Sequence, residues 1–254
     1  MISVIILGAG NLAIHLFKVF KEAETIEIKQ WYNRNLETIE QYKKDVEITN
    51  ELEDLIKADL YILAVSDDAI KDLSKKLPFS DRLVVHTSGA MTMHQIDKKN
   101  DRGVFYPLQT FSKDVDIDFS NVPFCLEVEN KVNFNLLIEL CEAIGSSYYK
   151  VNSEQRSALH LAAVFVNNFV NQLYRIGHEI TESKSVDFNI LKPLIFETAR
   201  KIENLSPYRA QTGPALRHDK KTIKKHLKLL QKDQHKEIYK LITKTIQQTH
   251  GKEL

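Results

Sequence analysis

The sequence predicts an α/β protein in which a doubly wound, mainly parallel sheet is followed by a smaller all-helical domain. Up to residue 151, short apolar runs with strand character alternate with amphipathic segments, the rhythm of a parallel sheet joined by crossover helices. Beyond that residue no strand-like run remains, and apolar residues recur at helical spacing. We therefore expect two domains, residues 1–151 and residues 152–254.

The first strand and the turn after it indicate a nucleotide-binding fold. Ile2–Leu7 is a run of mostly β-branched or aliphatic residues, which suits a central strand buried on both faces. The next residues, Gly8–Ala13, have the G-x-G-x-x-A pattern and lead into an amphipathic helix, as in the dinucleotide-binding fingerprint of Rossmann folds. Gly8 permits the bend, and Gly10 lets a pyrophosphate approach the backbone at the helix N-terminus. The cofactor contacts predicted in this turn are Gly8, Ala9, Gly10, Asn11 and Leu12.

The end of the second predicted strand, 26–33, bears on the choice of cofactor. A site that prefers NAD usually has Asp or Glu at this strand end, where it binds the ribose 2′-hydroxyl. This sequence has Tyr32-Asn33-Arg34 instead, with no carboxylate at the tip. Arg34 can pair with a 2′-phosphate, and the alternative is a solvated surface arginine. The sequence therefore favours NADP, as NADPH, bound partly through Asn33 and Arg34.

Two further predicted strands, 59–65 and 82–87, end in residues that would face the same ligand. In a doubly wound sheet, ligands bind beyond the carboxyl ends of the strands. The cofactor contacts predicted at these ends are Val65, Ser66, His86 and Thr87. Ser88 and Gly89 come next, and a hydroxyl beside a glycine suits close approach to a nicotinamide or a substrate. The alternative is a simple turn, and the sequence does not decide between the two.

The other segments of the first domain give weaker signals. Further strands are expected at 46–49, 122–128 and 146–151, and helices at 36–44, 52–57 and 132–144. The segment 103–111 contains Pro107 and is expected to interrupt the alternation as a rigid X-Pro segment. Pro123, near the start of a predicted strand, is compatible with an edge position in the sheet.

The second domain is expected to be helical throughout. Helices begin near Ser153, cover 187–205, and run from Lys220 toward the end of the chain with a break near Asp233. The loop 208–219 lies between the last two helices and contains Gly-Pro with arginines on both sides. It is either an anion-binding or docking loop or a capped connection, and both interpretations stay open.

One helix of this domain has unusually few charges. Between His160 and His178 the single Lys, Arg, Asp or Glu is Arg175, although a helix that faces water usually carries several. We therefore expect most of its circumference to be buried. One face carries polar residues at helical spacing, namely His160, Asn167, Asn171, Tyr174 and His178. Buried polar groups need partners, which here are another helix, a second subunit or a ligand.

Composition argues against several classes of function. The chain has 254 residues, of which 43% are hydrophobic and 27% charged, and its formal net charge of +1 gives no overall attraction to nucleic acid. Its lysine-rich end is interpreted as the solvated face of an amphipathic helix. Cys125 and Cys141 lack metal-ligand spacing, so we interpret them as reduced core residues and expect no metal site. No apolar run reaches the length of a membrane span and no signal-peptide pattern precedes the first strand, so we expect a cytoplasmic protein.

Taken together, these motifs resemble the NADP oxidoreductases that join a Rossmann-like domain to a helical domain of unknown function. The matching segments are 8–13, 65–70, 86–90, 106–111, 160–167 and 212–219. More distantly, the chain is similar to pyrroline-5-carboxylate reductase, deazaflavin-dependent NADP reductase and the β-hydroxyacid dehydrogenases. The resemblance implies a Rossmann domain, an all-helical second domain that often dimerises, and a substrate cleft between them.

The sequence departs from these relatives at three positions. In β-hydroxyacid dehydrogenases a catalytic Lys precedes an Asn by one helical turn, whereas Ala163 precedes Asn167 here. The resemblance also implies a His at the position of Tyr106 and a Gly at the position of His218. The relatives' catalytic roles therefore do not transfer directly to these residues, and the resemblance implies no particular substrate.

The leading hypothesis is an enzyme that uses NADPH to transfer hydride to or from a small carbonyl, hydroxyl or imine substrate in the interdomain cleft. Such a reaction needs a proton donor beside the hydride acceptor. His160 is the first candidate because imidazole titrates near neutral pH, and Tyr106 and His86 are alternatives. The residues expected to orient the substrate are Ser88, Asn167 and Arg217.

A rival hypothesis from a different class is a non-catalytic NADP(H)-binding sensor or interaction protein, which the missing lysine favours. Under either hypothesis, a helical domain of this size has too few other residues to shield the charge-poor helix from water. We therefore expect a homodimer built mainly through the helical domains. A small-molecule substrate is the other expected partner, and neither nucleic acid nor a membrane is expected.

Overall fold

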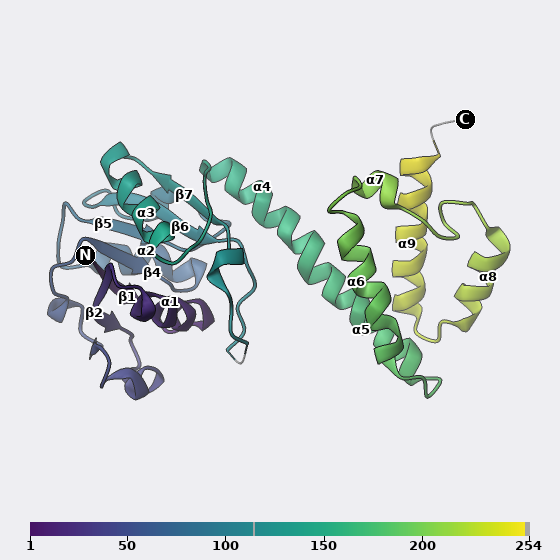
Figure 1. Cartoon of the computed structure of the whole chain (residues 1–254), viewed down its shortest axis with the longest axis horizontal. Helices are drawn as coiled ribbons and strands as arrows, with labels where there is room; N and C mark the ends of the chain where they lie inside the picture. Colours follow the sequence, from purple (N-terminus) through teal and green to yellow (C-terminus); the bar gives the residue numbers. More distant parts are fainter. Residues whose placement is uncertain (114, 252–254) are drawn as a thin grey trace. The chain divides into compact units, whose positions relative to one another are not determined.

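The computed structural model describes residues 1–113 and 115–251, and the chain divides into two compact units, Met1–Phe165 and Val166–Leu254 (Figure 1). The last strand ends at Lys150. The division into units falls later, inside a helical segment that continues across it. The expected domain limits, 1–151 and 152–254, therefore stay a prediction.

The first unit is built on an eight-stranded sheet with the order β3-β2-β1-β4-β5-β6-β7-β8 (Figure 1). Its strands are β1 (Ile2–Leu7), β2 (Ile26–Tyr32), β3 (Glu47–Thr49), β4 (Leu60–Leu63), β5 (Leu83–His86), β6 (Asp101–Pro107), β7 (Phe124–Val128) and β8 (Tyr148–Lys150). Every neighbouring pair is parallel except β6 and β7, which are antiparallel. The predicted mainly parallel sheet is confirmed.

Helices cover both faces of this sheet. They are α1 (Asn11–Glu22), α2 (Asp67–Lys76) and α3 (Lys131–Ala143). A fourth helix, α4 (Ser153–Ala163), follows the last strand. Val4 and Ile6 of β1 belong to one buried cluster, with α1 and α3, whereas Ile5 and Leu7 belong to the other, with α2. Since successive side chains of a strand point to opposite faces, a continuous apolar strand such as β1 fits only between two apolar layers. The doubly wound arrangement predicted from this strand is thus confirmed.

Two of the helices expected in the first unit are only short 3₁₀ turns. Segment 36–44 forms the turns Leu36–Thr38 and Glu40–Tyr42, and segment 52–57 forms Leu52–Asp54. Of these residues only Ile39 is buried, so neither segment has an apolar face large enough to stabilise a longer helix by packing.

Strand β6 was not predicted, and the interpretation of 103–111 as an irregular X-Pro segment is wrong over β6. Gly103 weakens the strand pattern in the sequence, but it is needed where β6 and β7 pack closely. A Cβ at this position would lie 2.9 Å from Val128 Cγ1 and 3.0 Å from the Glu127 carbonyl oxygen. The edge position with which Pro123 is compatible does not occur, because β7 begins after this proline and lies between β6 and β8.

The second unit contains only helices among its described residues. They are α5 (Val170–Glu182), α6 (Lys192–Lys201), α7 (Pro207–Ala210), α8 (Lys220–Leu229) and α9 (Asp233–His250), with a 3₁₀ turn at Phe188–Leu191. A π-helical stretch, Val164–Phe169, joins α4 to α5. Pro193 lies in the first turn of α6, where its missing N–H leaves no hydrogen bond unmade.

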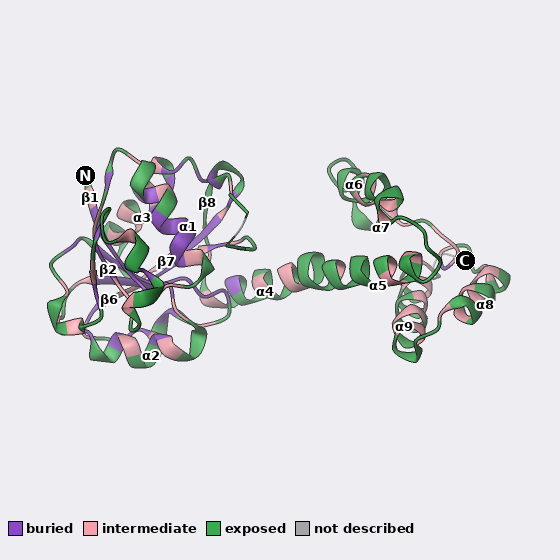
Figure 2. Cartoon of the chain, turned by 90° about the horizontal axis from the view of Figure 1, so that it is seen from below, coloured by how far each residue is buried: buried purple, intermediate pink, exposed green. Residues whose placement is uncertain are grey.

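The second unit buries few of its apolar side chains. Among its described residues only Ile176 and Ala215 are buried hydrophobics, and green dominates its helices in Figure 2. The expectation that the charge-poor helix is buried is wrong for the single chain, in which Asn167, Asn171 and His178 are exposed. Within the part of the chain that the structure describes, most of this helix is therefore accessible to solvent.

Candidate functional site

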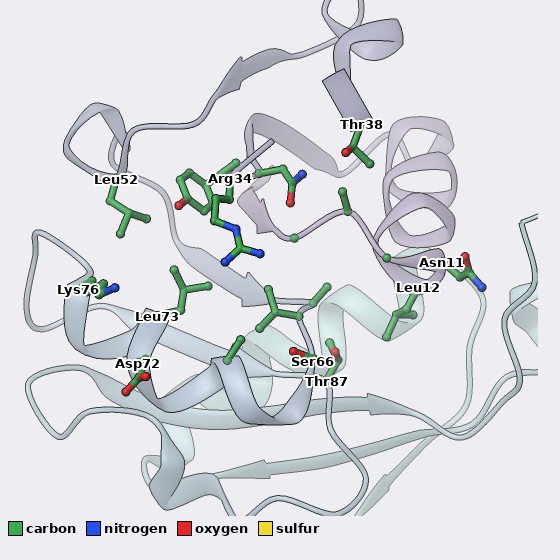
Figure 3. A pocket seen from close by; sticks show the side chains of 18 residues that line it. Asn11, Leu12, Arg34, Thr38, Leu52, Ser66, Asp72, Leu73, Lys76 and Thr87 are labelled. Atoms are coloured by element: carbon green, nitrogen blue, oxygen red, sulfur yellow. The ribbon is translucent and has the colours of Figure 1, made fainter. Parts of the chain in front are cut away.

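A cavity of about 820 Å³ lies in the first unit at the carboxyl ends of β1, β2 and β4 (Figure 3). Its lining residues are Gly8, Ala9, Gly10, Asn11, Leu12, Tyr32, Asn33, Arg34, Thr38, Leu52, Ala64, Val65, Ser66, Ala69, Asp72, Leu73, Lys76 and Thr87. This is the edge of a doubly wound sheet at which nucleotides bind.

The glycine turn after β1 has the backbone conformation that the sequence motif requires. Gly8 has φ +117°, and a Cβ there would lie 2.2 Å from the Ala64 carbonyl oxygen. The Trp31 indole nitrogen donates a hydrogen bond to the Gly8 carbonyl oxygen at 2.6 Å, which fixes the turn from the other side. A Cβ on Gly10, in contrast, would meet nothing within 4 Å. Gly8 is therefore a packing requirement of the fold, whereas Gly10 borders open space in the cavity.

The first turn of α1 offers backbone N–H groups to this space. Gly10 is the N-cap residue of α1, and no side chain caps that helix terminus among the described residues. Uncapped N–H groups and the helix dipole together favour an anion at this position. The turn thus fits the pyrophosphate of a dinucleotide.

Arg34 brings a cation to the far side of the cavity. Its guanidinium points into the cavity from the residues after β2 (Figure 3). Within the part of the chain that the structure describes, Arg34 forms no ion pair. Asn33 and Thr38 also line this end. An arginine without a carboxylate partner is available for a phosphate group.

Residues of α2 form the wall of the cavity opposite Arg34, and the sequence did not predict them as cofactor contacts. Ala69, Asp72, Leu73 and Lys76 line the cavity, and they lie on one face because they recur at three- and four-residue spacing. The rule that ligands bind at strand ends says nothing of residues further along a helix. The same periodicity in the sequence was the available signal, although it also fits a solvated helix face.

The cavity brings together ten of the eleven predicted cofactor contacts, and His86 is the exception. Those in the lining are Gly8, Ala9, Gly10, Asn11, Leu12, Asn33, Arg34, Val65, Ser66 and Thr87. The His86 ring is fully buried and bound to the backbone instead. Its Nδ1 accepts a hydrogen bond from the Ser88 N–H at 3.1 Å, and its Nε2 lies 3.2 Å from the Thr92 carbonyl oxygen. Burial, reinforced by the nearby Arg156 charge, lowers the pKa of His86 to about 4.

Tyr106 and His160 form a second polar cluster beside the end of β5. The Tyr106 hydroxyl lies 3.1 Å from His160 Nδ1, and the two rings meet edge to face with centroids 6.1 Å apart. Gly89 lies against both, since a Cβ on it would be 2.6 Å from His160 Nδ1 and 2.7 Å from Tyr106 Cζ. Burial raises the pKa of Tyr106 to about 12, so its hydroxyl stays protonated at neutral pH.

This cluster directly follows the cavity along the chain. Thr87 lines the cavity, and the next residue, Ser88, accepts hydrogen bonds through its Oγ from the N–H groups of Ala90 at 3.2 Å and Met91 at 3.0 Å. These bonds hold the turn that places Gly89 against the cluster. Three of the four predicted catalytic residues, Ser88, Tyr106 and His160, therefore lie around one turn.

Asn167, the fourth predicted catalytic residue, belongs to the second unit. It lies in the π-helical stretch and is exposed, as is Arg217. The roles predicted for these two residues stay predictions. His218, at a position where the resemblance implies Gly, has φ +52°, a conformation that glycine adopts more easily.

Comparison with protein families and solved structures agrees with this geometry. Residues 3–89 match the family described as NADP oxidoreductase coenzyme F420-dependent, and residues 122–246 match a domain of unknown function (DUF2520). A crystal structure from Bacteroides fragilis, described as a "putative NADP oxidoreductase", shares 35% identity over 99% of this chain and 98% of that one, with a TM-score of 0.88. This chain belongs to the NADP oxidoreductase family.

More distant members of the same fold include enzymes of known type. A 1-pyrroline-5-carboxylate reductase from Streptococcus pyogenes has a TM-score of 0.64 at 15% identity, over 98% of both chains. An imine reductase from Myxococcus stipitatus, in complex with NADP⁺, has a TM-score of 0.67 at 15% identity, over 99% of this chain and 95% of that one. At these identities the likeness shows the fold alone. No curated protein matches the chain.

The structure also bears on other kinds of site. Among residues 1–113 and 115–251, no group of three or more His, Cys, Asp or Glu is placed to hold a metal ion. Cys125 and Cys141 are buried free thiols, and burial raises the pKa of both. No helix of the described residues is long and apolar enough to cross a membrane.

Proposed function

We propose that this protein transfers hydride between NADP(H), bound in the cavity, and a small carbonyl, hydroxyl or imine compound beside Ser88 and Gly89. The observation that carries the proposal is the continuity of two sites within one unit. Thr87 lines the cavity, and the Tyr106–His160 cluster packs on Gly89, two residues further along the chain. A nucleotide site and a proton-donating pair thus share the end of β5.

The residues of the cavity fit a phosphorylated dinucleotide. Gly10 leaves open space beside the uncapped N-terminus of α1, and Arg34 supplies an unpaired cation at the other end. Bound NADPH supplies the hydride. The chain's own residues hold the pyrophosphate and the 2′-phosphate and leave the nicotinamide and the substrate to the turn after β5.

We assign to His160 the role of donating a proton to the substrate when the substrate accepts the hydride. Tyr106 keeps its hydroxyl proton at neutral pH, and we assign the 3.1 Å contact in the neutral pair as a hydrogen bond from this hydroxyl to His160 Nδ1. When the ring takes up a second proton, both of its nitrogens carry one: Nδ1–H then donates to the Tyr106 hydroxyl oxygen, and Nε2–H gives its proton to the substrate, which returns the ring to its neutral form.

The choice of cofactor is tested by affinity. NADPH should bind at least about tenfold more tightly than NADH, since a charge-assisted contact to the 2′-phosphate contributes about 1.5–3 kcal/mol. Arg34→Ala should remove most of this preference in a fluorescence titration. Arg175→Ala, an exposed arginine of the second unit, is the matched control and should leave it intact. Equal affinities of the wild type for the two nucleotides would refute the preference for NADP.

The chemistry is tested by NADPH oxidation with a panel of small carbonyl and imine compounds. His160→Ala should lower turnover by about 10²- to 10⁴-fold, the usual contribution of a general acid, while NADPH affinity stays close to wild type. Tight NADPH binding without turnover of any compound, together with a nucleotide-dependent protein partner, would instead support a non-catalytic sensor. A destabilised His160→Ala variant that still turned over its substrate would give His160 a structural role only.

A further inference from the structure

A buried arginine joins three parts of the first unit. Arg156 of α4 has no exposed surface, and its guanidinium pairs through Nη1 with the Glu127 carboxylate of β7. Its Nη2 donates hydrogen bonds to the Met91 carbonyl oxygen at 2.5 Å and to Ser153 Oγ at 3.3 Å. The N–H and hydroxyl of Ser153 in turn bind Glu127, at 3.1 Å and at 2.9–3.0 Å. We call these four residues the Arg156 clamp.

Stability alone is a weak reason for such a clamp. A buried ion pair loses much of its Coulomb energy to desolvation, and well-packed apolar residues of similar size are often at least as stabilising. The Arg156 clamp even leaves one group unpaired, because Arg156 Nε is buried without a hydrogen-bond partner among the described residues. We therefore ask which elements the clamp holds in place.

What the clamp holds is the surroundings of His160. His160 follows Arg156 by four residues, so both lie on the same side of α4. Met91 ends the turn in which Ser88 Oγ accepts two N–H groups and Gly89 packs against His160 and Tyr106. Glu127 belongs to β7, whose partner strand β6 carries Tyr106. The clamp thus links the three elements that carry Gly89, Tyr106 and His160.

We propose that Arg156 is a positioning residue: by holding α4 against β7 and the turn after β5, it keeps His160 Nδ1 bonded to Tyr106 and leaves Nε2 for the substrate. The inference rests on the proposed role of His160. The contacts at Gly89 leave no spare room, so a small displacement of α4 breaks the 3.1 Å bond between the two side chains. A displacement of about 1 Å in a catalytic group can cost about a hundredfold in rate.

Two variants separate positioning from folding. Arg156→Lys keeps the charge, but an ammonium group cannot bond the carboxylate and the Met91 carbonyl in a planar fork. Arg156→Met combined with Glu127→Leu removes both charges together, so no charge is left buried and unpaired. The control is Arg102→Met, which breaks the ion pair between Arg102 of β6 and Glu129. That pair joins β6 to Glu129, the residue that follows β7, and among the described residues neither partner forms a hydrogen bond or ion pair with α4.

The kinetic readout is a double-mutant cycle with His160. In the wild-type background, Arg156→Lys should lower kcat for NADPH oxidation by about tenfold to a hundredfold and leave NADPH affinity unchanged. In the His160→Ala background, the same change should cost less than about twofold, because it acts through His160. Equal losses in both backgrounds would overturn the proposal.

The spectroscopic readout needs no substrate. The hydroxyl proton of Tyr106, protected by its bond to His160, should give a slowly exchanging NMR signal in the wild type and in Arg102→Met. Both Arg156 variants should lose this signal while melting as cooperative folded proteins. Its retention in a folded Arg156→Lys and in the double variant would overturn the inference even if no substrate is found. Wild-type kcat in His160→Ala would instead refute the proposed function.

Discussion

The two units of this chain treat their apolar side chains in opposite ways. In the first unit, Ile5 of β1 and Leu137 of α3 have no exposed surface, and two buried clusters fill both sides of the sheet. In the second unit, Leu194 and Phe196 of α6 are 63% and 70% exposed, and only two described hydrophobic residues are buried. The first unit carries its core within one chain. The second has the apolar residues of a core but lacks the surface to cover them, so we propose that a second copy of the chain covers them.

The largest expected effect follows from this difference. Light scattering at micromolar concentration should give the mass of two chains. Leu194→Asp combined with Phe196→Asp should give the mass of one, because each buried apolar side chain contributes about 1.5–3 kcal/mol to association. Val132→Asp is the matched control: Val132 is 73% exposed on α3 of the first unit, and its replacement should leave the dimer intact. A monomeric wild type would refute the assembly.

This difference in burial between the two units also explains how much of the fold could be predicted from the sequence. In the first unit, the apolar residues of β1 find their packing partners within the same chain, so local patterns predicted the fold class and all strands but β6. Strand β6 was missed because of Gly103. A glycine is needed there since β7 packs closely against it, and this tertiary contact leaves no pattern in the local sequence. In the second unit, helical spacing correctly predicted helices. It could not show that the apolar faces stay exposed, since burial depends on what packs against them.

The candidate site was predictable to a similar extent. Strand ends and the glycine motif indicated most of the cavity lining, because ligands bind at a fixed edge of such a sheet. The α2 wall was missed, since nothing local distinguishes a cavity face from a solvated one. The hydrogen bond between Tyr106 and His160 joins residues 54 positions apart, and no spacing rule predicts a pair of that kind.

The close packing of the first unit should make Gly8 far less replaceable than Gly10. Gly8→Ala combines an unfavourable φ of +117° with a Cβ 2.2 Å from the Ala64 carbonyl oxygen, so it should destabilise the protein by about 3 kcal/mol or more. Gly10→Ala should leave the melting temperature nearly unchanged and weaken NADPH binding, because its methyl group would occupy the space open to the pyrophosphate. Similar melting temperatures for the two variants would contradict the packing argument.

A third, smaller effect comes from His86 in the core of the first unit. Its pKa is about 4 when folded, compared with 6.5 for an ordinary histidine, so the unfolded chain takes up the proton first as the pH falls. The free energy of unfolding should therefore keep its full value above pH 6.5 and fall by on the order of 3 kcal/mol between pH 6.5 and 4, as the unfolded chain is protonated at His86. Urea unfolding at several pH values should show this loss. His86→Asn keeps an acceptor near Nδ1 and should remove that part of the pH dependence, and an unchanged pH profile would contradict the assignment.

The smallest expected effect compares one left-handed residue from each unit. His218 of the second unit has φ +52° and Asp81 of the first has φ +57°. The N–H groups of both residues are bonded, that of Asp81 to the Lys99 carbonyl oxygen at 2.9 Å and that of His218 to the Ala215 carbonyl oxygen at 3.2 Å. Among the described residues the two differ in their side chains, because only the Asp81 carboxylate adds a hydrogen bond, from Ser80 Oγ at 3.0 Å. His218→Gly should therefore stabilise the protein by up to about 1 kcal/mol, because relief of the left-handed strain exceeds the added chain entropy. Asp81→Gly should gain nothing, since it loses the side-chain contact that offsets the strain. Thermal melts of the two variants decide the matter, and an equal gain for both would mean that surrounding contacts do not modify the cost of a left-handed residue in either unit.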